Sequence, residues 1–160
     1  MGLRGLPALA IGIGAIAGLR TLIAPAIVSR YVHRKDLKLH SSRLKFLKSG
    51  KAANAFAAFA LGELVNDKLP FTPNRTQPPS LAARIASGAL CGAALYSARR
   101  HGPVRGALLG GLGAAAGSFG GLELRRRIGR RLHVPDRAVA VAEDALAVTG
   151  GVAIVRQATA

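Results

Sequence analysis

Long apolar stretches separated by basic blocks are the feature that most limits what this chain can fold into. Five apolar stretches stand out, at residues 6–28, 52–66, 81–98, 104–124 and 138–155. Basic blocks at 30–51 and 125–137 lie between them. This alternation is typical of multi-span membrane proteins. We therefore expect an all-α, polytopic helical membrane bundle that forms a single domain over residues 1–160.

The lengths of the stretches indicate which of them can cross a bilayer, because a crossing helix needs about 20 apolar residues. We expect four full spans, at 6–28, 81–98, 104–124 and 138–155. Residues 52–66 are too few, so this fifth element is expected to be shorter or re-entrant. The first two and the last two stretches each read as a glycine-rich span followed by a shorter one with acids. That resemblance predicts a weak inverted repeat, as found in transporters.

The charge of the chain is strongly positive, with 23 Lys and Arg against 7 Asp and Glu. In a soluble protein this excess would suggest a nucleic-acid partner. Here aromatic residues make up only 4% and Trp is absent, so the chain lacks aromatic platforms on which bases stack. We expect no nucleic-acid partner. The expected partners are the lipid bilayer and, at the basic blocks, anionic lipid head groups; residues 30–51 suit a short basic helix on the membrane surface.

The orientation in the membrane depends on a small difference in charge. With five crossings, the two sides carry nearly equal numbers of Lys and Arg, and the denser block at 30–51 favours the cytoplasmic side. The N-terminus would then lie outside. A second interpretation of the N-terminus stays open, because Arg4, the apolar run after it and the small residues at 15–17 also match a cleaved signal peptide.

Patterns for catalysis or metal binding are missing from the apolar stretches. Cys91 is the only cysteine. The histidines, all in or beside basic connections, are His33, His40, His101 and His133. The apolar stretches therefore contain no serine–histidine, cysteine–histidine or metal-ligand constellation. We expect no enzyme activity, no metal and no cofactor.

Arg20 lies within the first apolar stretch, followed by Thr21. An arginine at the centre of a membrane helix costs at least about 2.5 kcal/mol on insertion scales, so it needs a partner or water. Pro25 cannot donate a hydrogen bond to the Thr21 carbonyl, which predicts a kink or break just past Arg20 and a polar locus within the bilayer. The alternative is that Arg20 lies near the membrane–water interface and extends its guanidinium into it through the aliphatic part of the side chain.

Carboxylates in other apolar stretches are candidate partners for Arg20. Glu143 and Asp144 lie about two turns inside the last stretch, and adjacent residues point about 100° apart on a helix, so one of them is expected to pair with Arg20. Glu63 is the second candidate.

Glu63 and Asp67 lie four residues apart on one face of a helix. Arg75 and Arg84 follow closely enough to pair with them. The candidate intramembrane polar cluster comprises Arg20, Thr21, Glu63, Asp67, Arg75, Glu143 and Asp144.

Glycine recurs along the fourth apolar stretch. The expected helix-packing positions are Gly106, Gly110, Gly113, Gly117 and Gly121. Without side chains there, a neighbouring helix can approach backbone to backbone. The neighbour is a helix of the same monomer or of a second copy, so a homo-oligomer is an expectation. A pore lined by these glycines is the alternative.

Several motifs in combination resemble one protein family. They are GLRTLIAPAIVSR (18–30), GELVNDKLPFTPNRTQPP (62–79), ARIASGALCGAAL (83–95), GALLGGLGAAAGSFGG (106–121) and VPDRAVAVAEDALAV (134–148). Together they resemble the bacterial membrane proteins called domain of unknown function 4126. The resemblance implies a small multi-pass helical protein of the bacterial inner membrane and implies no reaction, ligand or partner.

Two functions fit these observations. The favoured one is a transport or channel-like protein for a small solute or ion, built around Arg20, Glu63, Glu143 and Asp144. The alternative is a structural or accessory membrane protein in which the same buried charges only fix helix packing.

Overall fold

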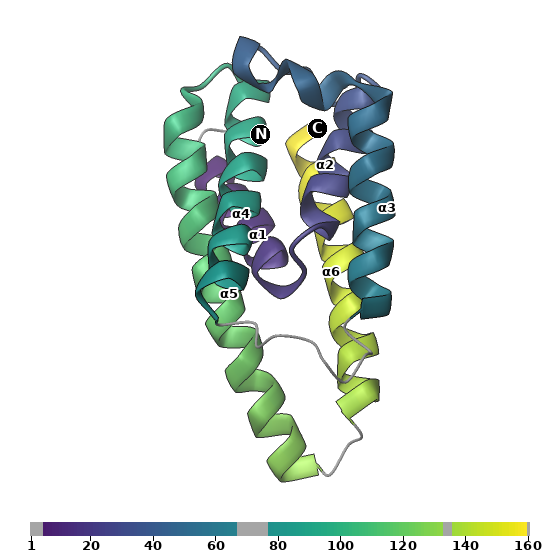
Figure 1. Ribbon diagram of the computed structural model, residues 1–160. Coiled ribbons are helices and arrows are strands. Elements are labelled where there is room, and N and C mark those ends of the chain that lie inside the picture. The colour runs from purple at the N-terminus through teal and green to yellow at the C-terminus, as the bar shows by residue number, and fades with distance from the viewer. Residues whose placement is uncertain (1–4, 67–76, 133–135, 160) are drawn as a thin grey trace.

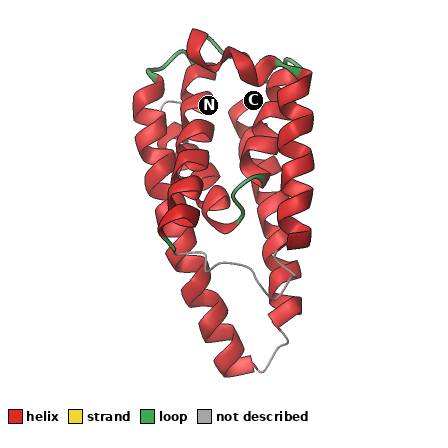
Figure 2. Cartoon of the chain, in the orientation of Figure 1, coloured by secondary structure: helices red, strands yellow, loops and turns green. Residues whose placement is uncertain are grey.

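The described part of the chain is helical throughout its regular structure (Figure 2). The structure is a computed structural model that describes residues 5–66, 77–132 and 136–159. Its elements are α1 (Leu6–Leu19), α2 (Ile23–His33), the 3-10 helix η2 (Ser42–Lys48), α3 (Gly50–Asn66), α4 (Pro78–Ala98), α5 (Pro103–Leu132) and α6 (Asp136–Thr159). The all-α class is confirmed for these residues.

Three helices are long and apolar enough to cross a membrane. They are Pro78–Ala98, Pro103–Ile128 and Ala138–Thr159, in α4, α5 and α6. Large apolar side chains on the outside of the bundle, such as Leu108, Leu112 and Phe119 of α5, are more than half exposed. A surface of this kind suits contact with lipid better than contact with water. The bundle therefore has the properties of a membrane protein.

The fourth expected span, over residues 6–28, is not confirmed. The chain leaves the helix at Arg20, whose backbone is extended (φ −139°, ψ 113°), and α2 starts at Ile23. Figure 1 shows α1 entering the bundle and α2 returning towards the end from which α1 began. Pro25 falls in the first turn of α2, where a missing N–H disturbs no helical hydrogen bond. Residues 6–33 thus form a helical hairpin.

Close helix contact in one half of the bundle depends on glycine. A Cβ on Gly110 would overlap the carbonyl oxygen of Gly88 in α4, and one on Gly106 would overlap that of Gly92. Such backbone-to-backbone contact is open only to small residues. The α4–α5 pair is therefore held at a distance that no larger side chain at these positions allows.

Three further glycines of α5, Gly113, Gly117 and Gly121, face α1. A Cβ on Gly113 would overlap the carbonyl oxygen of Ile11, and one on Gly117 that of Ala15, while Gly121 meets only the side chain of Leu19. The contact residues advance in the same direction along both helices, so α1 runs parallel to α5. The inverted repeat required these two segments to run in opposite directions, and the structure does not support it.

The other half of the bundle consists of α2, α3, η2 and α6. Helix α2 packs against α3 and α6, while α5 packs against α4 and α1 and touches α6 only slightly. Helix α3 has 17 residues and corresponds to the expected shorter element at 52–66. The hairpin joins the two halves, because α1 belongs to one and α2 to the other (Figure 1).

One end of the bundle, here called the cationic end, carries η2, the α4–α5 turn and the C-terminus of α6. In η2, Leu44 and Leu47 are buried in the core of the bundle while Lys45 and Lys48 are exposed. The second basic block behaves differently from the connection we expected at 125–137: its first residues extend α5 as far as Leu132.

Candidate functional site

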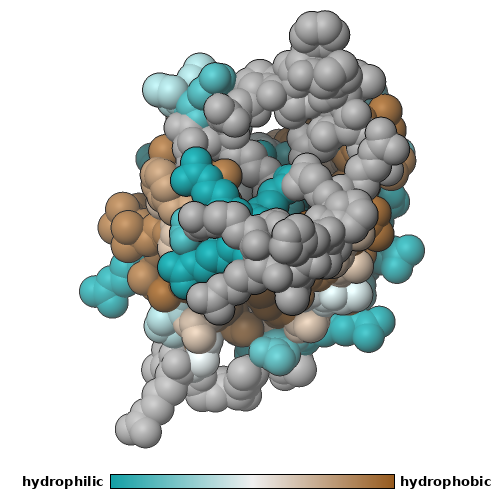
Figure 3. Space-filling model, turned by 90° about the horizontal axis from the view of Figure 1, so that it is seen from below, coloured by the Kyte–Doolittle hydropathy of each residue, from teal (hydrophilic) through white to brown (hydrophobic). Residues whose placement is uncertain are grey.

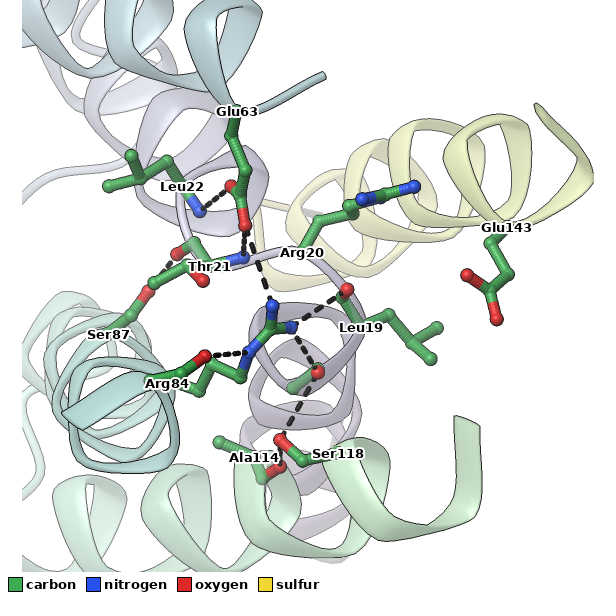
Figure 4. Close-up of polar contacts among 12 residues, drawn as sticks. Leu19, Arg20, Thr21, Leu22, Glu63, Arg84, Ser87, Ala114, Ser118 and Glu143 are labelled. Atoms are coloured by element: carbon green, nitrogen blue, oxygen red, sulfur yellow. Dashed lines mark hydrogen bonds and ion pairs between the residues drawn. The ribbon is translucent and has the colours of Figure 1, made fainter. Parts of the chain in front are cut away.

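The reversal between α1 and α2, residues Gly18–Leu22, is here called the hairpin tip. Polar side chains from three other helices converge on it, as Figure 4 shows. A break in a helix leaves backbone donors and acceptors without their helical partners. In an apolar bundle each such group needs another partner, since an unsatisfied one costs several kcal/mol in hydrocarbon.

Glu63, in the last turn of α3, binds the free donors at the start of α2. The Thr21 N–H donates to Glu63 Oε1 and the Leu22 N–H donates to Oε2, both with an N···O distance of 2.8 Å. A carboxylate at this position also interacts favourably with the positive end of the helix dipole. Glu63 therefore caps α2 from a different helix.

Arg84 of α4 binds the free acceptors at the end of α1. Its Nη1 donates to the Gly18 and Leu19 carbonyl oxygens, at 2.7 and 2.9 Å. Its Nε donates to Ser80 Oγ at 3.4 Å. A cation at a helix C-terminus is favourable for the same electrostatic reason as an anion at the N-terminus. The side chain is buried, so the polar groups around it supply the contacts that water would otherwise make.

Two serines complete the set of contacts at the hairpin tip. Ser87 Oγ donates to the Thr21 carbonyl oxygen. Ser118 Oγ lies 3.2 Å from the Gly18 carbonyl oxygen and 2.8 Å from that of Ala114. Both serines are buried within otherwise apolar helices. The broken backbone is therefore held by side chains from α3, α4 and α5.

Arg20 lies at the hairpin tip but points away from Glu63 and Arg84 (Figure 4). Its Nε forms an ion pair with Asp144 Oδ1 of α6 at 2.5 Å, and the side chain is only 1% exposed. Of the two adjacent acids in α6, Asp144 meets Arg20. Glu143 Oε2 lies 3.8 Å from Nη1 of Arg125 in α5. Glu63, the second candidate from the sequence, binds the backbone of the hairpin tip and lies near Arg84.

Ion pairs between described residues connect separate helices: Arg84–Glu63 links α4 and α3, Arg20–Asp144 links the hairpin tip and α6, and Arg125–Glu143 links α5 and α6. Figure 3 views the bundle from the end opposite the cationic end, with hydrophilic surface in the middle of that face and apolar patches around it. Within the part of the chain that the structure describes, no three His, Cys, Asp or Glu side chains are placed to hold a metal ion.

The sequence reasoning found part of this site. Asp67 and Arg75 lie outside the described residues, so their proposed place in the cluster stays a prediction. From the sequence, Arg84 was predicted only as a partner for a carboxylate, and its contact with backbone carbonyls was not predicted. The roles of Ser87 and Ser118 were not predicted either. One signal was present: Arg84 and Ser87 are three residues apart, which puts two polar groups on one face of an apolar helix.

Comparison with known proteins gives one match. The sequence model of a family described as Domain of unknown function (DUF4126) matches residues 8–158. No curated protein and no solved structure matches the chain.

Proposed function

The chain belongs to the DUF4126 family, and we propose that it is a multi-pass protein of the bacterial inner membrane through which a small solute or ion passes. The hairpin tip would be the polar site on the path. The observation that carries this proposal is the reversal of the chain inside an otherwise apolar bundle. Non-helical backbone at membrane depth occurs where it is buried in protein or lines a water-filled cavity, and broken helices of this kind form the ion and substrate sites of transporters.

The partial exposure of Asp144 and Arg125 supports water near the site. Their side chains are 21% and 24% exposed, whereas Arg20, the partner of Asp144, is almost fully buried. Charged side chains within membrane segments face the bundle interior or a water-filled cavity rather than lipid. The ion pairs of α6 would therefore border an aqueous path between α5 and α6, two helices that barely contact each other.

The caps at the hairpin tip suggest how such a path would open. Glu63 and Arg84 occupy the two ends of the broken helix, and each belongs to another helix. A shift of α3 would free the donors at the start of α2, and a shift of α4 would free the acceptors at the end of α1. A passing anion or cation would replace the side chain that left.

The hairpin supports a proposed orientation in the membrane. Because α1 enters from the cationic end and α2 returns to it, the start of α1 and the basic block at 30–51 lie on one side, contrary to the expectation of an N-terminus opposite this block. The positive-inside rule then assigns the cationic end to the cytoplasm.

The structural or accessory role remains the second candidate, and the satisfied contacts of the hairpin tip favour it. Glu63, Arg84, Ser87 and Ser118 all bind backbone groups of the tip. In that case the charges hold the hairpin in place, and the protein needs no solute at all.

A flux assay separates the two functions. Purified protein in lipid vesicles would be tested by stopped-flow light scattering with glycerol, urea and potassium chloride as probes. Under the transport proposal, at least one probe crosses faster than in empty vesicles, and Glu63→Gln changes that rate several-fold. Glu123→Gln is the matched control, because Glu123 forms an exposed pair with Arg127 four residues later. Rates equal to those of empty vesicles for all three probes would leave only the structural role.

A further inference from the structure

A pocket at the cationic end lies away from the hairpin tip, between the segment before η2 and the α4–α5 turn. Its volume is about 620 Å³. The polar side chains lining it are His40, Ser41, Ser42, Ser97, Arg100 and His101. Among the described residues that line it, Arg100, His40 and His101 can carry positive charge and none is acidic, so the pocket suits an anion.

The two walls of the pocket are tied together by hydrogen bonds. Ser97 Oγ accepts the N–H groups of His40 and Ser41, at 3.2 and 2.8 Å. The Ser97 carbonyl oxygen lies 3.1 Å from His40 Nδ1. A carbonyl can only accept, so Nδ1 carries the proton and Nε2 is left for a ligand. These contacts fix His40 and Ser97 before any ligand binds.

Arg100 is held at the edge of this pocket in a left-handed backbone conformation, with φ 59°. After a helix C-terminus this conformation usually belongs to glycine, because a side chain there crowds the backbone. The chain has 20 glycines, yet among the described residues the two positions with positive φ are Arg100 and Lys35. Arg at position 100 therefore carries a conformational cost that glycine would avoid, and such positions often mark functional sites.

We propose that this pocket binds a phosphate group, with Arg100 as its main charged ligand and His101 and the serine hydroxyls as further donors. Arginine binds phosphate through paired N–H groups, and serine and histidine add single hydrogen bonds. Because η2 at the cationic end exposes Lys45 and Lys48, which anionic lipid would attract, the phosphate can belong to the head group of an anionic phospholipid or come from solution. The inference does not depend on solute transport.

Binding is measured by calorimetry on the purified full chain in a neutral detergent. The probes are dioctanoyl phosphatidylglycerol, dioctanoyl phosphatidylcholine and inorganic phosphate. Arg100→Gly is the test variant, and Lys45→Gln is the control, since it removes one positive charge from the same end without touching the pocket.

Arg100→Gly is expected to weaken phosphatidylglycerol binding about tenfold, the loss expected for a charge-assisted hydrogen bond. It should also raise Tm by about 2 °C, since glycine relieves the left-handed strain. Lys45→Gln should leave the affinity nearly unchanged. Binding of phosphatidylglycerol without inorganic phosphate identifies a lipid site, and binding of both identifies phosphate itself as the ligand.

Unchanged affinity in Arg100→Gly overturns the site. An equal loss in Lys45→Gln overturns it too, because it would show a general attraction to the cationic end. Equal binding of phosphatidylcholine and phosphatidylglycerol, insensitive to Arg100, would have the same consequence.

Discussion

Glu63 Oε1 and Arg84 Nη2 lie 3.9 Å apart, and each side chain binds a different end of the same broken helix. The carboxylate accepts from the first N–H groups of α2 and the guanidinium donates to the last carbonyls of α1. Each charge therefore interacts with a helix end of opposite polarity and with the other charge. This arrangement explains how a membrane bundle tolerates two charges and an interrupted helix in one place. The charged side chains bind the free backbone groups of the helix ends, and those backbone groups in turn solvate the charges.

The first prediction concerns this pair. Glu63→Ala should lower the free energy of unfolding by about 1–3 kcal/mol, because two partly buried N–H groups lose their acceptor. Thermal unfolding in detergent would measure the change. Combined with Arg84→Ala, the loss should be smaller than the sum of the single losses, since the two side chains support one structure. Additive losses would contradict the coupling of the two caps.

The second prediction concerns Arg20. Removing one partner of a buried ion pair typically costs about 3–5 kcal/mol, because the other charge is stranded. We expect a double-mutant cycle of Arg20→Gln with Asp144→Asn to show strong coupling. The same cycle with Glu143→Gln is the matched control and should be close to additive, since Glu143 pairs with Arg125 instead. Stronger coupling to Glu143 than to Asp144 would refute the pairing.

The third prediction uses the glycines of α5. Gly117→Leu should prevent stable folding, because a Cβ at this position already overlaps the Ala15 carbonyl oxygen. Gly120→Ala, three residues along the same helix, is the control: nothing lies within 4 Å of its added Cβ. Since alanine is the better helix former, this variant should be neutral or up to about 1 kcal/mol more stable. A Gly117→Leu variant that melts like the parent would exclude close packing of α1 on α5.

The fourth prediction concerns location. The protein should stay with membranes through an alkaline carbonate wash and require detergent for release, because three of its helices can cross a bilayer. Immunoblotting of the washed fractions gives the answer. A stable monomer in the aqueous fraction would contradict every membrane interpretation made here.

The helical fold could be predicted from the sequence, because the positions and lengths of the apolar stretches are local features. The break after Arg20 could also be read, since Pro25 and a charge in an apolar stretch act on their own helix. The sequence did not predict whether the chain only bends at that break or reverses its direction. The reversal depends on contacts with Glu63 and Arg84, which lie on α3 and α4, far from the hairpin tip in sequence.

The choice between Glu143 and Asp144 was undetermined for a similar reason. Adjacent residues on a helix differ in direction by about 100°, so one can face Arg20 while the other faces elsewhere. Which of them does so depends on the rotation of α6 about its axis. Packing against α1 and α2 sets that rotation, and a single sequence does not reveal it.

The length of α1 determines where a membrane voltage would act on this molecule. Helix α1 has 14 residues, or about 21 Å at 1.5 Å per residue, while the hydrocarbon core is about 30 Å thick. In the membrane arrangement proposed above, a hairpin that enters from the cationic end would stop inside the core, and the Arg20–Asp144 pair at its tip would lie within the electric field. Moving one elementary charge through the full field involves about 2.3 kcal/mol per 100 mV. Any motion that separates this pair along the membrane normal would carry a fraction of that energy, so the resting potential of the cell would bias it.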